Sequence, residues 1–228
     1  MLSERQAQII KGLVRQYIKT AEPVSSKFLS EKYDFGLCPS AIRIEFQFLI
    51  KEGFLEQPHT SAGRVPTDKA YRFFVDSLKE KREEKIEEEL EDILKGMQDK
   101  FRMASEITKF MADNSSSFVN LHFLKEGVDL KEGLDEIFKA KDESFVSSFV
   151  NFMENFEKNI EKLRNSKTMV YIGEENLIPK SKNITLICSE CKLPNQKAFI
   201  TILGPKRMDY EKNIKLINSL NKVLKELI

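Results

Sequence analysis

The chain has 228 residues, of which 41% are hydrophobic, so it can bury real cores, and we predict two modest domains rather than disorder. Its formal net charge of +1 at pH 7 excludes a general electrostatic attraction to nucleic acid, so any phosphate-binding surface must be a local patch. No segment is long and apolar enough to cross a bilayer, and the first residues lack a secretory pattern, which predicts a cytoplasmic protein with no membrane partner.

The first third of the chain shows the pattern of three short helices. Ser3 and Gln6 have the spacing of a capping box, and apolar residues recur at helical spacing up to about Thr20. A second helix is predicted over residues 26–33, and the glycine in the segment 34–37 fits the turn of a helix-turn-helix.

The third helix is predicted to begin at Pro39, which suits the first helical position, and to end at Glu52, because Gly53 follows. Its outer face then carries Ser40, Arg43, Ile44, Gln47 and Lys51. A major groove admits one helix, in which arginine bonds guanine and glutamine bonds adenine, while lysine suits phosphate. This face predicts either a groove-reading surface or an ordinary solvated helix face. Ile44 slightly favours the first, because an aliphatic residue in the middle of a polar face is expected to meet a thymine methyl group or a protein partner.

A hairpin follows the third helix. Two short strands, residues 54–57 and 64–66, flank a polar turn that contains Pro58 and Gly63. The turn should face outward, and a hairpin directly after three helices is typical of a winged helix that binds DNA. We expect DNA contacts in the wing from His59, Thr60, Ser61 and Arg64. The alternative for His59 is a loop residue bonded within its own turn.

A long amphipathic helix is predicted beyond the wing. Thr67 and Asp68 should cap a helix that ends near residue 78. After a charged run, apolar residues keep steps of three and four from Ile86 to Met111, so one helix is expected within residues 79–114. It is a candidate linker and dimer seam, and burial against the C-terminal domain of the same chain fits the pattern equally well.

Residues 115–228 are predicted to form a mixed domain with a mostly antiparallel sheet. The expected strands are residues 117–124, 168–172, 183–188 and 197–203, and the expected helices are residues 130–139, 144–165 and a last helix from 209. The middle helix has a phenylalanine-rich stripe, which is more typical of core than of a ligand pocket. The predicted fold class is therefore α+β, with an N-terminal winged helix-turn-helix, a long linker helix and this C-terminal domain.

Few residues suggest chemistry. Cys188 and Cys191 form a C-x-x-C, which fits a metal or redox pair or two reduced structural thiols, and the chain has one other cysteine and two histidines as further ligands. No nucleophile is paired with a base. We expect no enzyme activity, no metal and no cofactor.

Several motifs resemble one known family, the heat-inducible transcription repressor HrcA. In the first third they are Glu22-Pro23-Val24, the helix residues 39–45 and the run Leu-Glu-Gln-Pro-His-Thr-Ser-Ala-Gly-Arg-Val-Pro-Thr over 55–67. Residues 171–176 and 204–210 are similar to the family's C-terminal motifs. The resemblance implies a homodimeric repressor that binds an inverted-repeat operator in double-stranded DNA upstream of chaperone genes, and that depends on the GroE chaperonin. It also implies a GAF-like fold for residues 115–228.

The chain departs from the family pattern at several places. Ala41 and Ile44 stand where the family usually has a hydroxyl and an amide, so neither side chain can make the hydrogen bonds to bases that those groups allow. Lys206 adds a charge before the last helix. The chain is short for the family, which implies that the inserted dimerisation domain is absent. The alternatives to a repressor are a protein-interaction module and a ligand-sensing regulator that keep the winged-helix fold.

Overall fold

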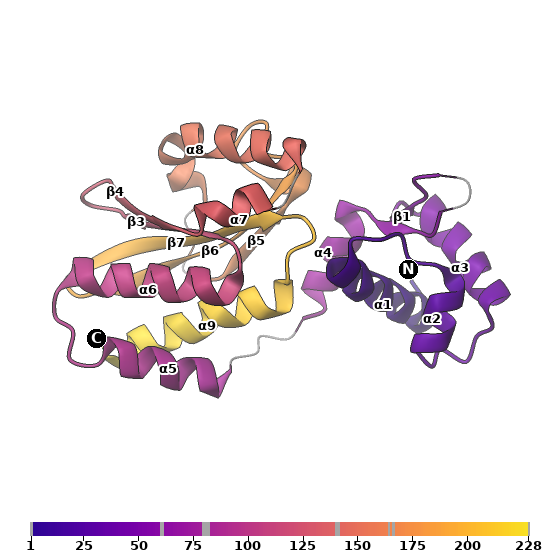
Figure 1. Cartoon of the computed structure of the whole chain (residues 1–228), viewed down its shortest axis with the longest axis horizontal. Coiled ribbons are helices and arrows are strands. Elements are labelled where there is room, and N and C mark those ends of the chain that lie inside the picture. The colour runs from indigo at the N-terminus through magenta and orange to yellow at the C-terminus, as the bar shows by residue number, and fades with distance from the viewer. Residues whose placement is uncertain are drawn as a thin grey trace. The chain divides into compact units, whose positions relative to one another are not determined.

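The chain divides into two compact units, Met1–Leu78 and Lys79–Ile228, which we call unit 1 and unit 2 (Figure 1). The structure, a computed structural model, describes residues 2–59, 62–78, 83–139, 142–163, 165 and 167–227. Each unit buries apolar residues of its own and therefore has a separate hydrophobic core.

Unit 1 consists of helices around a small core and a two-stranded hairpin. Its elements are α1 (Glu4–Thr20), α2 (Ser26–Lys32), α3 (Pro39–Lys51), β1 (Leu55–Glu56), β2 (Val65–Pro66) and α4 (Asp68–Asp76). The predicted capping box is confirmed, because the Ser3 hydroxyl accepts from the Gln6 backbone N–H and the Gln6 side chain accepts from the Ser3 backbone N–H. Pro39 stands in the first turn of α3, as predicted.

One expected cap is absent in unit 1. Thr67 precedes α4, but its hydroxyl makes no hydrogen bond to that helix. It donates instead to the carbonyl oxygens of Gly53 and Phe54, at 2.7 and 3.0 Å. The hydroxyl therefore ties the start of α4 back to the residues that follow α3.

Unit 2 is a five-stranded antiparallel sheet with helices on both faces. Its strands are β3 (Phe118–Phe123), β4 (Val128–Glu132), β5 (Met169–Ile172), β6 (Ile184–Leu193) and β7 (Gln196–Pro205), in the order β4-β3-β7-β6-β5. Its helices are α5 (Glu84–Leu94), α6 (Lys100–Ser115), α7 (Leu134–Lys139), α8 (Glu143–Leu163) and α9 (Tyr210–Leu227), with a short 3-10 turn, η1 (Gly173–Glu175). The antiparallel sheet confirms that part of the predicted fold class.

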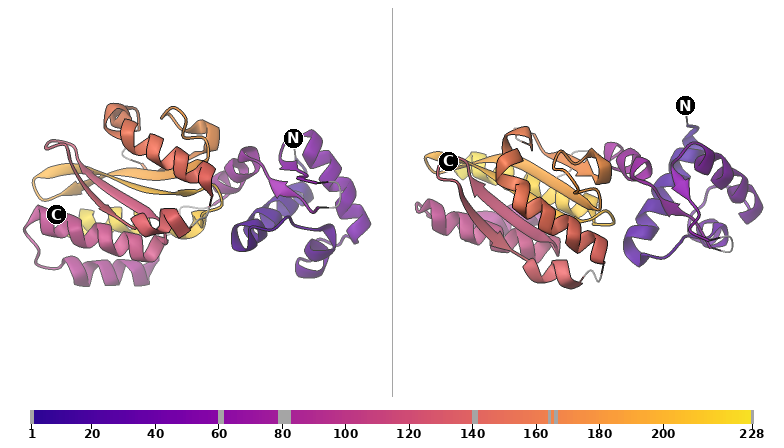
Figure 2. Two further views of the ribbon diagram at one scale, coloured as in Figure 1. Left: turned by 45° about the horizontal axis from the view of Figure 1, so that its top comes forward. Right: turned by 90° about the horizontal axis from the view of Figure 1, so that it is seen from above.

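The two faces of the sheet have different covers (Figure 2). On one face α8 buries the phenylalanine stripe, which includes Phe145, Phe152 and Phe156, so the prediction that this stripe is core is confirmed. On the other face lie α6 and α9, and α5 packs against these two helices. The sheet is therefore buried on both sides.

The prediction of one long helix over residues 86–111 is wrong. The helix breaks after Leu94, where Gly96 takes a positive φ of 73°, and a new helix begins behind Asp99, whose carboxylate accepts from the Arg102 backbone N–H at 2.7 Å. Both helices bury their apolar stripes within unit 2, which is the alternative that the pattern left open. Local glycine and aspartate signals override a continuous stripe.

The predicted helix over residues 130–139 is also wrong in its first part. Residues 128–132 form β4, an edge strand that pairs with β3, and only Leu134–Lys139 is helical. This strand raises the strand number of the sheet from the expected four to five.

Candidate nucleic-acid interface

The structure places the five predicted residues of the third helix on one exposed face. Ser40, Arg43, Ile44, Gln47 and Lys51 are all exposed, while Ile42, Phe46 and Leu49 are buried on the opposite side of α3. At about 100° per residue, the exposed set together with Phe48 spans an arc of about 140°. We call these six side chains the outer face of α3.

The outer face of α3 is cationic. It carries Arg43 and Lys51 and no carboxylate, and neither cation is in an ion pair with any residue that the structure describes. Glu45 borders the face, but the Gln6 side-chain amide donates to its carboxylate at 2.9 Å and holds it aside. A locally cationic surface thus exists on a chain whose net charge is only +1.

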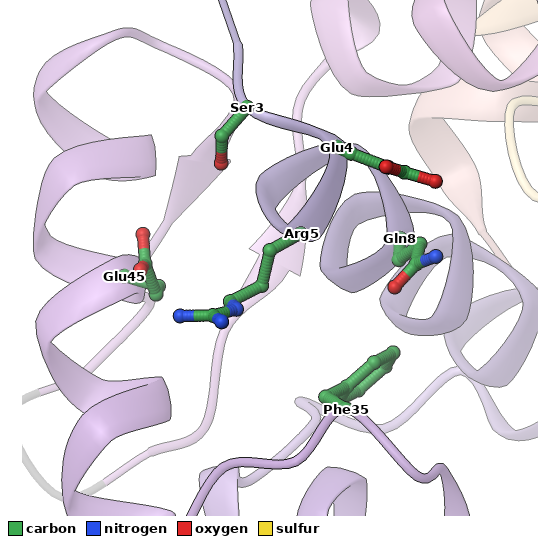
Figure 3. A pocket seen from close by; sticks show the side chains of 6 residues that line it. All are labelled: Ser3, Glu4, Arg5, Gln8, Phe35 and Glu45. Carbon is green, nitrogen blue, oxygen red and sulfur yellow. The ribbon is translucent and has the colours of Figure 1, made fainter.

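A shallow polar pocket lies beside this border (Figure 3). Its lining consists of Ser3, Glu4, Arg5, Gln8, Phe35 and Glu45. Arg5 points its guanidinium toward the side of Glu45, so charges of both signs meet there. The pocket is open to solvent and its lining holds no nucleophile paired with a base. It therefore has the character of a solvated charged surface and not of a catalytic site.

The outer face also carries two apolar side chains. Ile44 is 73% exposed and Phe48 is 39% exposed. The sequence interpretation missed Phe48, although its position four residues after Ile44 places the two on neighbouring turns of one face.

The wing is joined to the segment before α2. Val24 and Arg64 exchange two backbone hydrogen bonds, with N–O distances of 2.9 and 2.8 Å, next to the pair β1–β2. Gly63 permits this approach, because a Cβ there would lie 2.5 Å from the carbonyl carbon and oxygen of Val24. The Glu22-Pro23-Val24 motif and the glycine of the wing motif thus serve one contact.

Arg64 does not reach outward as expected. Its side chain is only 9% exposed, its Nη1 donates to the carbonyl oxygens of Ala62 and Gly63 at 3.1 and 3.3 Å, and its guanidinium lies 5.8 Å from the ring centroid of Phe46. Burial lowers the pKa of this guanidinium, and its Nε is buried without a hydrogen-bond partner in the described part of the chain. The face of the Phe46 ring and two loop carbonyls attract the cation inward, so Arg64 braces the wing against α3.

The remaining wing residues are partly described. His59 is exposed, and its carbonyl oxygen accepts from the Ala62 backbone N–H at 2.9 Å, which closes the turn. The predicted contacts Thr60 and Ser61 lie outside the described residues.

The two C-terminal motifs support the fold of unit 2. The buried Tyr210 hydroxyl donates to the Lys206 carbonyl oxygen at 2.5 Å, and Asp209 accepts from the Lys212 backbone N–H at the start of α9. The Asn176 side-chain amide donates to the carbonyl oxygens of Gly173, Ser181 and Ile184, at 2.8, 3.0 and 2.9 Å. These contacts close turns between elements of unit 2.

Cys188 and Cys191 are buried free thiols in β6. Because side chains alternate along a strand, residues three apart point to opposite faces of the sheet, so the two sulfurs do not converge on one ion. Burial raises the pKa of both thiols to about 12. Over the described ranges of the chain, no group of three or more potential metal ligands is found, and no helix is long and apolar enough to span a membrane.

Comparisons with known proteins converge on one family. Residues 55–214 match the family model described as HrcA protein C terminal domain. The chain is 54% identical over 77 residues to the heat-inducible transcription repressor HrcA of Natranaerobius thermophilus, a match that covers 34% of this chain and 22% of that protein. It is 46% identical over 107 residues to the repressor of the same name of Carboxydothermus hydrogenoformans, covering 47% of this chain and 31% of that protein. The chain thus spans less than a third of the length of these relatives.

One solved structure has the same fold. A crystal structure of a hypothetical protein superimposes with a TM-score of 0.81, covering 99% of this chain and 97% of that chain. The identity of 19% is low, so this likeness concerns the fold alone.

Proposed function

Because the chain belongs to the HrcA family of heat-inducible transcription repressors, we propose that it represses transcription by placing α3 in the major groove of double-stranded DNA. The observation that carries the proposal is the outer face of α3, which is exposed, cationic and free of carboxylates, next to a braced wing.

The residues of this surface divide by chemistry. Arg43 and Gln47 read base edges, since their guanidinium and amide groups can form paired hydrogen bonds with guanine and adenine. Lys51, Ser40 and the exposed wing residue His59 contact the phosphate backbone, and Thr60 and Ser61 are further wing contacts. Arg64 contributes indirectly, because it holds the wing against Phe46.

The operator and the assembly follow from the size of the reading surface. One helix and one wing make a small contact, so a homodimer on an inverted repeat supplies the affinity and specificity that a repressor needs. The apolar stripes of α5 and α6 are buried within unit 2, so the dimer uses another surface. The antiparallel sheet of unit 2 with helices on both faces supports the GAF-like assignment.

Control of chaperone genes in the cytoplasm and dependence on the GroE chaperonin complete the proposed function. The names of the relatives support repression that responds to heat, and the phenylalanine-rich interior under α8 supports the dependence on chaperonin, because incomplete folding exposes it. Operator affinity and refolding yield, measured with and without chaperonin, test this dependence; equal values in both conditions refute it.

Binding titrations on duplexes selected from a random-sequence pool test the central proposal. Arg43→Ala should relax the preference at one base pair by about tenfold, since a good bidentate pair discriminates by about 1–3 kcal/mol. Lys51→Ala should weaken binding to all duplexes alike and reduce the slope of the salt dependence by about one. The matched control is Lys158→Ala, an exposed lysine on α8 of unit 2, which should change neither.

A protein-interaction module is the second candidate, and the 73% exposure of Ile44 favours it. If the selected pool yields no sequence preference and no salt-sensitive binding, the repressor proposal fails and this second candidate replaces it.

A further inference from the structure

Ile44 and Phe48 form a two-residue apolar ridge on the outer face of α3. Both are exposed, and neither is needed for the core of unit 1, which α3 completes with Ile42, Phe46 and Leu49. A polar residue at either position would leave that core intact. Exposed isoleucine and phenylalanine side chains on adjacent turns therefore point to a contact outside the chain.

The neighbours of the ridge favour DNA as its occupant. The same arc of α3 carries Arg43 and Lys51 and no carboxylate, so the surface complements a polyanion. The ridge is also continuous with Gln47, whose side-chain amide makes no hydrogen bond to other residues in the described part of the chain. A protein partner for the ridge would need acidic groups arranged around an apolar patch. Every major groove already has phosphates on both sides of its base edges.

We propose that Ile44 and Phe48 read the C5-methyl groups of two thymines in the major groove. This inference rests on the proposed function. The thymine methyl is the apolar group that the major groove displays, and isoleucine and phenylalanine have no donor or acceptor for the other base edges. Side chains four residues apart on a helix lie about 5–6 Å from each other, and base pairs repeat every 3.4 Å or so, so the two thymines are one or two base steps apart.

The inference specifies one base of the recognition sequence. The preferred half-site of this chain should carry a thymine at the base pair that faces Ile44.

Deoxyuridine substitution tests the inference, since it removes the methyl group and keeps every hydrogen-bonding atom of thymine. The whole chain is first used to select its preferred duplex, and each thymine is then replaced singly by deoxyuridine. In each half-site two thymine positions should bind about fourfold more weakly when substituted, which is the effect of removing one buried methyl group from contact. In Ile44→Ala one of these two positions should lose its sensitivity in both half-sites, and in Phe48→Ala the other.

Val150→Ala is the matched control, because it truncates an exposed apolar side chain on α8 of unit 2. It should keep both deoxyuridine effects. Sequence-dependent binding without any deoxyuridine effect overturns the inference and leaves the proposed function standing. Deoxyuridine effects that persist unchanged in both variants also overturn it. Absence of any sequence-dependent binding overturns the proposed function itself.

Discussion

Helices α3 and α8 bury similar faces and present different ones. Each helix buries an apolar stripe that contains phenylalanine, with Phe46 in α3 and Phe152 in α8. The outer face of α8 carries charges of both signs, including Glu154, Lys158 and Glu161, as a helix that faces only water does. The outer face of α3 carries cations and an apolar ridge without a carboxylate. The buried side of a helix locates the core, and the exposed side indicates what the helix meets.

In both units the motifs that resemble the family have a structural role. In unit 1 Gly63 and Arg64 hold the wing to Val24 and Phe46, and in unit 2 Tyr210 holds the start of α9. These motifs build the support, while the exposed face of α3 carries the side chains that we propose contact DNA. Damage to the brace in unit 1 should therefore abolish reading, and damage within unit 2 should lower stability alone.

The largest effect is expected for Gly63→Ala. The new methyl group would lie 2.5 Å from backbone atoms of Val24, which cannot yield without breaking the two hydrogen bonds between Val24 and Arg64. We expect a loss of about 3 kcal/mol in the free energy of unfolding of unit 1, with loss of duplex binding. Urea unfolding and hydrogen exchange of residues 2–78 measure this change.

Gly36→Ala is the control for that substitution. Its Cβ would meet nothing within 4 Å, so only the left-handed backbone with φ of 63° opposes it, at about 1 kcal/mol. If the two alanine variants lose the same stability, the close approach at Val24 is not what Gly63 serves.

A smaller loss in the free energy of unfolding is expected for Asp129→Asn in unit 2. Burial alone would raise the pKa of Asp129, but hydrogen bonds from Asn120 and His122 and attraction to Lys131 outweigh it and lower the pKa. A lowered pKa in the folded state stabilises the protein above the unfolded pKa of about 3.9, and this stabilisation is lost as the pH falls through the folded pKa. The variant should lose about 2 kcal/mol at pH 7, and the difference from the unsubstituted protein should begin to shrink at about pH 4 and vanish only below the lowered pKa of the folded state.

Thermal unfolding as a function of pH measures the Asp129 effect, and duplex affinity should be unchanged. Asp135→Asn is the control, because its carboxylate is exposed and, among the residues that the structure describes, pairs with Lys139 alone; the substitution should leave the unfolding curve unchanged. A gap between Asp129→Asn and the unsubstituted protein that stays constant down to pH 2 would contradict the assignment to this carboxylate.

The smallest effect concerns the three cysteines. Cys38 is exposed before α3, and a hydrogen bond with the Ser40 side chain lowers its pKa, whereas burial raises the pKa of Cys188 and Cys191. Iodoacetamide should therefore add one group to the native chain, at Cys38, and three groups in urea, as peptide mass spectrometry can show. A native adduct on Cys191 would mean that β6 opens to solvent.

Much of unit 1 was predictable from local signals. Pro39 and Gly53 delimit α3, and Ser3 and Gln6 cap α1. The helical spacing of the apolar residues, three and four apart, indicates which face of each helix is buried. The inward orientation of the Arg64 side chain was not predictable from the sequence. It depends on the ring of Phe46, which is distant in sequence and becomes a neighbour only after folding.

The errors in unit 2 have local causes. The stripe from Ile86 to Met111 continues in phase across Gly96, so periodicity alone conceals the break that Gly96 and Asp99 encode. The edge strand β4 has only five residues, and their apolar and polar side chains do not alternate: Val128 is exposed, while Asp129 and Leu130 are half-buried, so the pattern suits a helix equally well.

The fastening of α5 to α9 has a mechanical consequence. Glu83 is the first residue of unit 2 that the structure describes, and its backbone N–H donates to the Ser219 hydroxyl at 3.3 Å. The buried Glu87, one turn later, accepts from the Lys222 side chain at 2.5 Å. The place where the polypeptide arrives from the reading unit is therefore clamped to the carboxyl-terminal helix. Any force or binding event that displaces α9 therefore also displaces the residues with which the described part of unit 2 begins.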